Sequence, residues 1–143
     1  MMILAFPDYL SQAQRLADRL NTPLAEVSPH HFPDRESFIR LPPTLPEHVI
    51  VCRSLNQPND KLIELLLCAA TARELGAKRL TLVAPYLCYM RQDFANQSGV
   101  AVSQRIIGKM LADLFDDVTH RRPAFASQIV TGSGNSYKKC HQP

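Results

Sequence analysis

The chain has 143 residues, 45% of them hydrophobic and 20% charged, which is typical of a single globular domain with its own core. Residues 1–120 carry 12 basic and 13 acidic residues, a net charge of −1, whereas residues 121–143 carry four basic residues and no acid. This distribution lacks the clustered basic face that nucleic-acid binding needs, and no apolar run approaches the roughly 20 residues of a membrane span, so neither nucleic acid nor a membrane is an expected partner.

The apolar pattern predicts strands that alternate with helices. Ala13, Leu16, Ala17 and Leu20 follow the i, i+3, i+4, i+7 spacing of an amphipathic helix, for which Ser11 is a plausible N-cap. A second helix opens near Pro58, where Asn59 or Asp60 is the expected cap, and Gly76 is its expected stop. The expected elements are a strand at 2–6, a helix at 11–20, strands at 24–27, 37–41 and 48–52, a helix at about 58–75, a strand at 79–84 and a helix at 102–115.

This alternation predicts an α/β sandwich with a largely parallel sheet. The run Val49-Ile50-Val51-Cys52 is apolar throughout, which indicates a strand that is buried on both faces. In such sheets ligands bind beyond the carboxyl ends of the strands. The segments that follow Val51 and Val83 are therefore the places where we expect chemistry.

Arg91, Gln92 and Asp93 stand together shortly after the strand at 79–84. The planar donor fork of Arg91 suits a phosphate or a carboxylate, Gln92 can recognise an amide or a hydroxyl, and Asp93 can orient the arginine. The residues alone leave the alternative of a surface ion pair between Arg91 and Asp93, which would contribute little.

A second polar group, "HHFPDRE", precedes the strand at 37–41. Phe32 supplies an aromatic face, and Asp34 and Glu36 supply two acceptors, which together would suit an adenine or an amine. The alternative is a simple proline turn that leads into the strand. The segment 56–60 is likewise open between a site and a helix-capping loop, and no Walker A or GxGxxG phosphate loop is present.

The four cysteines show no C-x-x-C spacing and no histidine partners at zinc-finger intervals, so we expect reduced thiols. His30 and His31 likewise have no nearby ligand partners for a metal. No basic region precedes the short apolar N-terminus, so a signal peptide is not expected. These features favour a cytoplasmic protein.

Three stretches of the chain resemble the N-terminal domain of the ribose-phosphate pyrophosphokinase family (phosphoribosyl pyrophosphate synthetases). They are "HFPDRESFIRL", "SLNQPNDKLIELLLCAATARELGAKRLTLVAPYLCYMRQDF" and "AVSQRIIGKMLADLFD", and the resemblance runs in register over residues 1–120. It implies a three-layer α/β sandwich of the phosphoribosyltransferase type. It also implies a role in nucleotide biosynthesis: transfer of the diphosphoryl group of ATP to the 1-hydroxyl of ribose 5-phosphate, with Mg²⁺ and release of AMP.

The resemblance implies roles for particular residues. Arg91 and Gln92 would contact ATP, with Asp93 in the same loop. Phe32, Asp34 and Glu36 match the motif F-x-D-x-E, which in this family contacts adenine from a neighbouring subunit, so a homo-oligomer is expected. His120 would stand for the family's magnesium-associated histidine.

The chain also departs from the family pattern. Arg35 stands where the family usually has glycine, and Phe94 follows R-Q-D where basic residues are common. Residues 121–143 lose the register; we expect a divergent basic tail whose composition permits disorder, apart from a strand-like piece at 128–131. The family's second domain, which carries the ribose-phosphate loop and the catalytic flap, has no counterpart in the 143 residues.

Three hypotheses follow. The chain is an ATP-binding half that binds Mg-ATP or ADP weakly and turns over ribose 5-phosphate only when a second domain is supplied. Alternatively, it is a non-catalytic module that oligomerises with a full-length synthetase and modulates it. The third is a gene remnant in which the short strand near Val118 leaves an exposed sheet edge.

Overall fold

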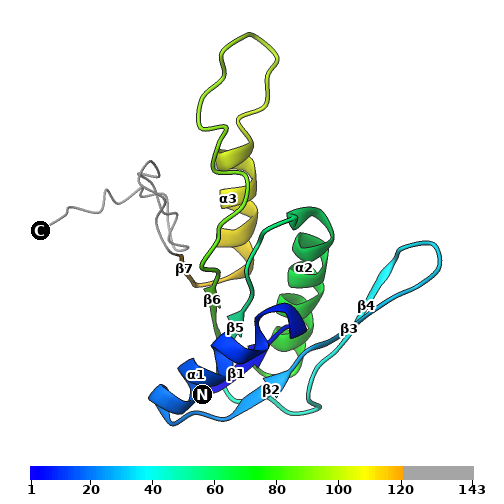
Figure 1. Cartoon of the computed structure of the whole chain (residues 1–143), viewed down its shortest axis with the longest axis vertical. Helices are drawn as coiled ribbons and strands as arrows, with labels where there is room; N and C mark the ends of the chain where they lie inside the picture. Colours follow the sequence, from blue (N-terminus) through cyan, green and yellow to red (C-terminus); the bar gives the residue numbers. More distant parts are fainter. Residues whose placement is uncertain (121–143) are drawn as a thin grey trace, which may run out of the picture.

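Five short parallel strands form the sheet at the centre of the structure, a computed structural model that describes residues 1–120 (Figure 1). The spatial order is β2-β1-β5-β6-β7, so the chain starts in the middle of the sheet and builds outward in both directions. The bounds are β1 Met2–Ala5, β2 Leu24–Glu26, β5 His48–Cys52, β6 Arg79–Val83 and β7 Asp117–Thr119. The prediction of an α/β fold with a parallel sheet is confirmed.

Helices cover both faces of this sheet. The 3₁₀ helix η1 (Pro7–Tyr9) leads into α1 (Leu10–Leu20) on one face, and α2 (Pro58–Glu74) and α3 (Ser103–Leu114) lie on the other. This is the expected three-layer arrangement. Residues 121–143, including the predicted strand-like piece at 128–131, lie outside the described residues.

Successive residues of the central strands point into two separate cores. On β5, Val49 and Val51 pack with α2 and α3, whereas Ile50 and Cys52 pack with α1. This alternation explains why the strand reads as a continuous apolar run: each side chain meets a helix on its own side.

The helix starts differ from the predicted caps. The residue before α1 is Tyr9 rather than Ser11, because η1 already turns the chain. The residue before α2 is Gln57, at φ +51°, and its own side chain makes no capping hydrogen bond. Pro58 occupies the first helical position, where a missing N–H costs nothing and the fixed φ already suits a helix. Gly76, at φ +104°, follows the end of α2 as predicted.

A two-stranded antiparallel hairpin stands apart from the main sheet. It consists of β3 (Ser28–His31) and β4 (Ser37–Arg40), and it extends away from the body beside α2 (Figure 1). The sequence predicts β4 but no strand at the position of β3, where Pro29 is unfavourable within a strand. Pro29 is tolerated because this strand lies outside the main sheet.

The last strand, β7, is three residues long and lies at the sheet edge, as expected. Arg79 pairs with Asp117 at 2.8 Å, and Arg73 pairs with Asp116 at 2.8 Å. Burial alone would raise the pKa of Asp116, but a hydrogen bond from the Leu80 amide and the Arg73 guanidinium outweigh it and lower that pKa. These charge contacts supplement the pairing of β7 with β6 and the packing of Val118 against the core. In the part of the chain that the structure describes, no helix is both long and apolar enough to cross a membrane.

Candidate functional site

The loops that follow β5 and β6 lie together at the carboxyl edge of the sheet. The amide of Arg53 donates to the carbonyl of Val83 at 3.0 Å, and the amide of Leu55 donates to the carbonyl of Tyr86 at 2.9 Å. The two loops therefore continue the pairing of their strands for several residues. The segments after Val51 and Val83, where the sequence predicts chemistry, therefore lie side by side.

The loop at 84–102 rises beyond the sheet above the start of α3 (Figure 1). Its stem is fixed on one side by the hydroxyl of Tyr89, which bonds to the side-chain oxygen of Asn59 at the start of α2. Tyr89 itself lies at φ +60°, a left-handed conformation that a tyrosine adopts only when its surroundings hold it there. The segment 56–60 thus acts as an anchor for this loop.

Arg91, Gln92 and Asp93 lie on this loop, and all three are exposed. Gln92 is the fixed member: its carbonyl accepts from the amide of Gln104 at 3.2 Å, and its side-chain oxygen accepts from the hydroxyl of Ser103 at 3.4 Å. The predicted alternative of an ion pair between Arg91 and Asp93 is not seen, and among the described residues the Arg91 guanidinium has no carboxylate within 4.0 Å. As far as the described residues go, its donor fork is available to an anion.

The turn of the hairpin carries the second predicted group. The amide of Phe32 donates to the carbonyl of Glu36 at 2.9 Å, and the amide of Arg35 donates to the carbonyl of Phe32 at 2.8 Å. Asp34 accepts from the amide of Glu36 at 3.1 Å, so its side chain stabilises the turn as well as facing solvent. This is a three-residue hairpin loop with Pro33 pre-set at the first turn position and a left-handed residue at its end. The predicted proline turn is therefore the tip of a hairpin.

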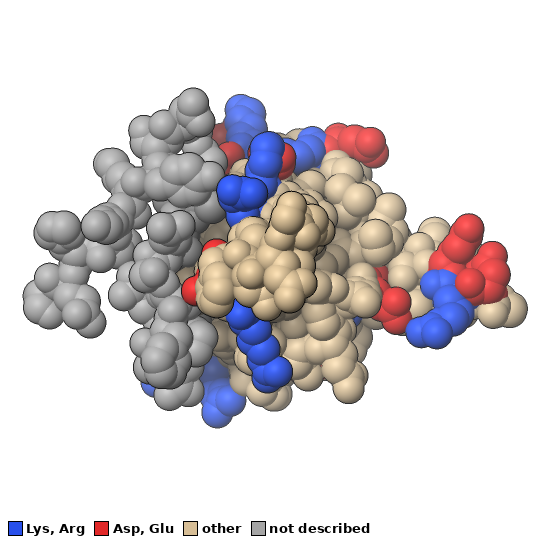
Figure 2. All heavy atoms as spheres, turned by 90° about the horizontal axis from the view of Figure 1, so that it is seen from above, with Lys and Arg blue, Asp and Glu red and all other residues tan. Residues whose placement is uncertain are grey.

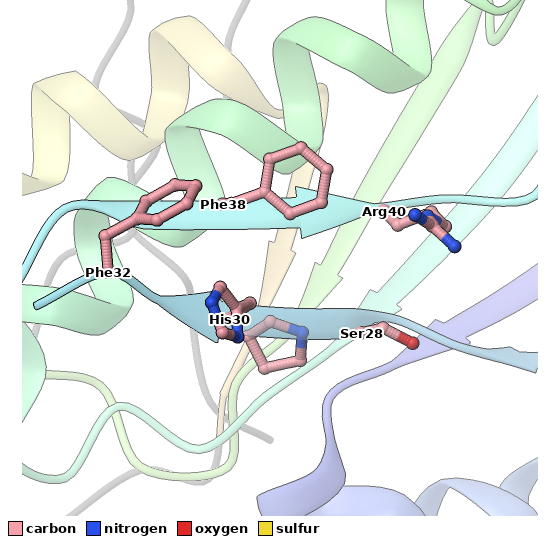
Figure 3. Close-up of a pocket in the computed structure, with 6 residues that line it drawn as sticks. Ser28, His30, Phe32, Phe38 and Arg40 are labelled. Atoms are coloured by element: carbon pink, nitrogen blue, oxygen red, sulfur yellow. The ribbon is translucent and has the colours of Figure 1, made fainter.

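Phe32 forms part of an aromatic surface on the outer side of the hairpin (Figure 3). Its ring meets those of His30 and Phe38 edge-on, with centroids 5.3 and 6.3 Å apart. Both phenylalanines are 45% exposed. They border a shallow hollow of about 410 Å³, whose lining residues are Ser28, Pro29, His30, Phe32, Phe38 and Arg40.

The cysteines near the edge are not available as nucleophiles. Burial raises the pKa of Cys52 to about 12 and that of Cys88 to about 11. Both thiols are protonated near neutral pH, and a nucleophilic cysteine needs the opposite shift. The expectation of reduced, structural thiols agrees with this environment.

The comparisons with known proteins assign a family to this arrangement. Residues 1–114 match the family model described as the N-terminal domain of ribose phosphate pyrophosphokinase. The chain belongs to the ribose-phosphate pyrophosphokinase family. Because the match ends at residue 114, it covers all of the strands and helices described above except β7.

Curated ribose-phosphate pyrophosphokinases share substantial identity with the chain. The protein of Saccharolobus solfataricus is 43% identical over 103 residues, which cover 71% of this chain and 35% of that protein. The proteins of Methanopyrus kandleri and Methanobrevibacter smithii are 34% and 35% identical over 78% and 90% of this chain, and each alignment covers 39% of the relative. The aligned part of this chain therefore spans less than half of each relative.

The fold is also that of a solved structure. The phosphoribosylpyrophosphate synthetase of Mycobacterium smegmatis superposes with a TM-score of 0.68 and 22% sequence identity, over 85% of this chain and 48% of that chain. This match supports the architecture: one parallel sheet between two helical layers.

Within one copy of the chain, the two predicted groups are not brought together. Arg91, Gln92 and Asp93 lie on the loop above α3, and the tip of the hairpin extends on the far side of α2 (Figure 1). Figure 2 looks down on this end of the molecule: acidic and basic side chains gather at the hairpin, and those on the visible described surface form no continuous basic face. The sequence stretch 32–36 and the stretch 91–93 are therefore two surfaces rather than one pocket.

His120 directly follows β7. Among residues 1–120, no three His, Cys, Asp or Glu side chains gather as a metal-binding group. Mg²⁺ prefers oxygen ligands, and the nearby carboxylate of Asp117 is already paired with Arg79. The described residues by themselves do not fit a resident magnesium site, and His120 as a magnesium ligand stays a prediction.

Sequence reasoning missed a buried charge cluster beyond the carboxyl ends of the neighbouring strands β1 and β5. Arg53 and Glu64 are in ionic contact with side chains only 7% and 1% exposed, and Asp8 and Lys61 pair beside them at 2.5 Å. Lys61 also donates to the carbonyl of Ser54 at 2.9 Å. The signal was available: Glu64 interrupts the apolar run "LIELLLC", and a charge in such a run needs a partner.

Arg35, where the family usually has glycine, adopts φ +71°. A side chain in this left-handed region costs about 1–2 kcal/mol, which glycine avoids. Its ion pair with Asp60, at 3.6 Å, joins two largely exposed side chains and contributes about 0–1 kcal/mol. We therefore expect Arg35→Gly to raise the stability by about 1 kcal/mol, or roughly 4 °C in Tm, measured by thermal unfolding. Arg35→Ala is the control, since it loses the ion pair and keeps the Cβ, and equal stability of the two variants would contradict this account.

Proposed function

We propose that this chain binds ATP, as Mg-ATP, and provides the nucleotide-binding part of the ribose-phosphate pyrophosphokinase reaction. The observation that carries the proposal is the exposed guanidinium of Arg91, which meets no carboxylate within residues 1–120 and lies on an anchored loop at the carboxyl edge of a parallel sheet. This is where open α/β sheets bind ligands. Ribose 5-phosphate would be bound by a second domain, because the family places its ribose-phosphate loop there.

The arrangement suits diphosphoryl transfer, which depends on positioning and on neutralising charge. Arg91 can offer two parallel donors to phosphate oxygens. Gln92 is fixed against the start of α3 and so presents its amide nitrogen in a defined place. Mg²⁺ would arrive with the triphosphate as part of the substrate and neutralise its charge.

The separation of the two surfaces supports a homo-oligomer. The tip of the hairpin, with Phe32, Asp34 and Glu36, extends away from the loop of its own chain (Figure 1). A second copy would bring this tip to the adenine of a nucleotide bound at Arg91. The exposed aromatic surface of the hairpin is consistent with such an association. We also place the protein in the cytoplasm, where nucleotide precursors are made.

A second candidate function is a non-catalytic module that associates with a full-length synthetase. It is favoured by Phe94, which follows R-Q-D and is 70% exposed, and by Arg35 at the tip of the hairpin. Size-exclusion chromatography of a mixture with a full-length synthetase tests it. Co-elution together with a changed rate would support a modulator, and separate elution would exclude it.

Calorimetric titration with Mg-ATP tests the first function. We expect saturable binding with a Kd of roughly 0.1–1 mM, because the chain supplies nucleotide contacts but not those of the ribose-phosphate domain. We also expect no AMP release when ribose 5-phosphate is added to this chain alone. The absence of binding heat at millimolar Mg-ATP would contradict the proposal.

A further inference from the structure

The hairpin is tied to the body of the protein at one buried point. His31 and Ser37 are partners across the hairpin, and they form the last pair before the turn. Both reach the same atom: Oε1 of Glu64 lies 2.8 Å from Nε2 of His31 and 3.4 Å from the hydroxyl of Ser37. The two strands are thus held to α2 immediately before the turn that carries the proposed adenine contacts.

The second oxygen of Glu64 faces the sheet. Oε2 is in ionic contact with the guanidinium of Arg53, the first residue after β5. That guanidinium lies 3.9 Å from the ring centroid of Phe6, and its Nε is 3.6 Å from Oδ1 of Asp8. Glu64 therefore connects the hairpin on one side with the loops at the carboxyl edge on the other.

The other contacts between the hairpin and the body are either distant from the turn or weak. Ile39 and Leu41 pack at the margin of the core, at the end of the hairpin that is away from the turn. At the tip itself, the ion pair of Arg35 with Asp60 is exposed and contributes little. The carboxylate of Glu64 is only 1% exposed and contacts both strands, at His31 and at the hydroxyl of Ser37. It is the stronger constraint because burial of the carboxylate favours keeping its partners in place.

We propose that Glu64 is a positioning residue for nucleotide binding. By holding His31 and Ser37, it fixes the orientation in which the turn presents Phe32, Asp34 and Glu36 to the base. The guanidinium of Arg53 compensates the buried negative charge of Glu64. The inference rests on the proposed function, because it assumes that Arg91 of one copy contacts the phosphates and that the hairpin of another copy contacts the adenine.

Two double variants of the full chain separate positioning from simple stability. Arg53→Gln with Glu64→Gln removes both charges and keeps an acceptor for His31 and Ser37. Arg53→Leu with Glu64→Leu removes both charges and the acceptor. Neither leaves a lone buried charge, so both are expected to fold, and circular dichroism and thermal unfolding verify this.

Binding of Mg-ATP and of magnesium tripolyphosphate is then compared. We expect the leucine pair to weaken Mg-ATP binding about tenfold and tripolyphosphate binding less than about twofold, because only ATP has a base for the hairpin to meet. The glutamine pair should retain Mg-ATP binding within about threefold of the parent. A purely structural role would weaken both ligands together, and that result, or unchanged Mg-ATP binding by the leucine pair, would overturn the proposal.

Hydrogen exchange of the turn amides tests the positioning role of Glu64 separately from the proposed binding of ATP. The amides of Phe32 and Arg35 bond within the turn, and we expect faster exchange at both in the leucine pair than in the glutamine pair. If the parent chain binds neither ligand, the proposed function is wrong. Equal exchange in the two variants would show that Glu64 does not position the hairpin.

Discussion

Replacing Glu64 with alanine is expected to lower the free energy of unfolding by about 3–5 kcal/mol, as measured by urea unfolding. The substitution leaves the guanidinium of Arg53 buried, 7% exposed, without its carboxylate. Among the described residues, Nε and Nη1 of Arg53 have no acceptor in hydrogen-bonding geometry. Its charge is compensated by the direct contact with the buried Glu64 and, at 3.6 Å, by the more exposed Asp8, which also pairs with Lys61. A domain of this size has a total stability of about 5–15 kcal/mol, so this loss is a large fraction of it.

The control is the double replacement Arg53→Met with Glu64→Leu. It removes both charges and fills the space with apolar groups, and such exchanges are neutral or stabilising by about 1–4 kcal/mol. Asp8 keeps Lys61 at 2.5 Å, and His31 is 52% exposed and turns to water, so neither is left without a partner. If the double variant is less stable than Glu64→Ala, the buried pair is not the reason for the loss.

Replacing Arg91 with alanine is expected to weaken Mg-ATP binding by about 10–150-fold, the effect of one or two charge-assisted hydrogen bonds. The stability should not change, because the side chain is exposed and its guanidinium meets no carboxylate within the described part of the chain. Isothermal titration of both proteins with Mg-ATP measures the effect, and thermal unfolding verifies the stability.

Arg19→Ala is the matched control for Arg91→Ala. Arg19 is an exposed arginine near the end of α1, which packs on the other face of the sheet from α2 and α3. Its removal lowers the net charge by the same amount and should leave Mg-ATP binding unchanged within about twofold. Equal weakening by the two substitutions would mean that the nucleotide responds to overall charge and not to the loop.

The sheet and its helices could be predicted because both depend on local patterns. The run at 49–52 is apolar because helices cover both faces of β5, and Gly76 ends α2 because it readily adopts φ +104°. The position of Arg91 beyond β6 follows from the same rule, since ligand-facing residues come after parallel strands.

The remaining features depend on contacts between distant residues. No local pattern indicates that β3 pairs with β4, since Pro29 is unfavourable in a strand and the hairpin is stabilised by packing on α2. Likewise, Arg53 and Glu64 are 11 positions apart and on different elements, so their pairing appears only when β5 and α2 are packed together. The sequence predicts Ser11 as the cap because the apolar spacing does not reveal the 3₁₀ turn that precedes α1.

Nuclear magnetic resonance titration of the isotope-labelled chain with Mg-ATP tests the central claim most directly. The claim is that the loop at 84–102 binds the phosphates and that the tip of the hairpin meets the base. The predicted result is a saturable set of amide shifts at Tyr89, Arg91 and Gln92, with a second set at residues 32–36. Shifts confined to other regions, or none at millimolar Mg-ATP, would contradict the account.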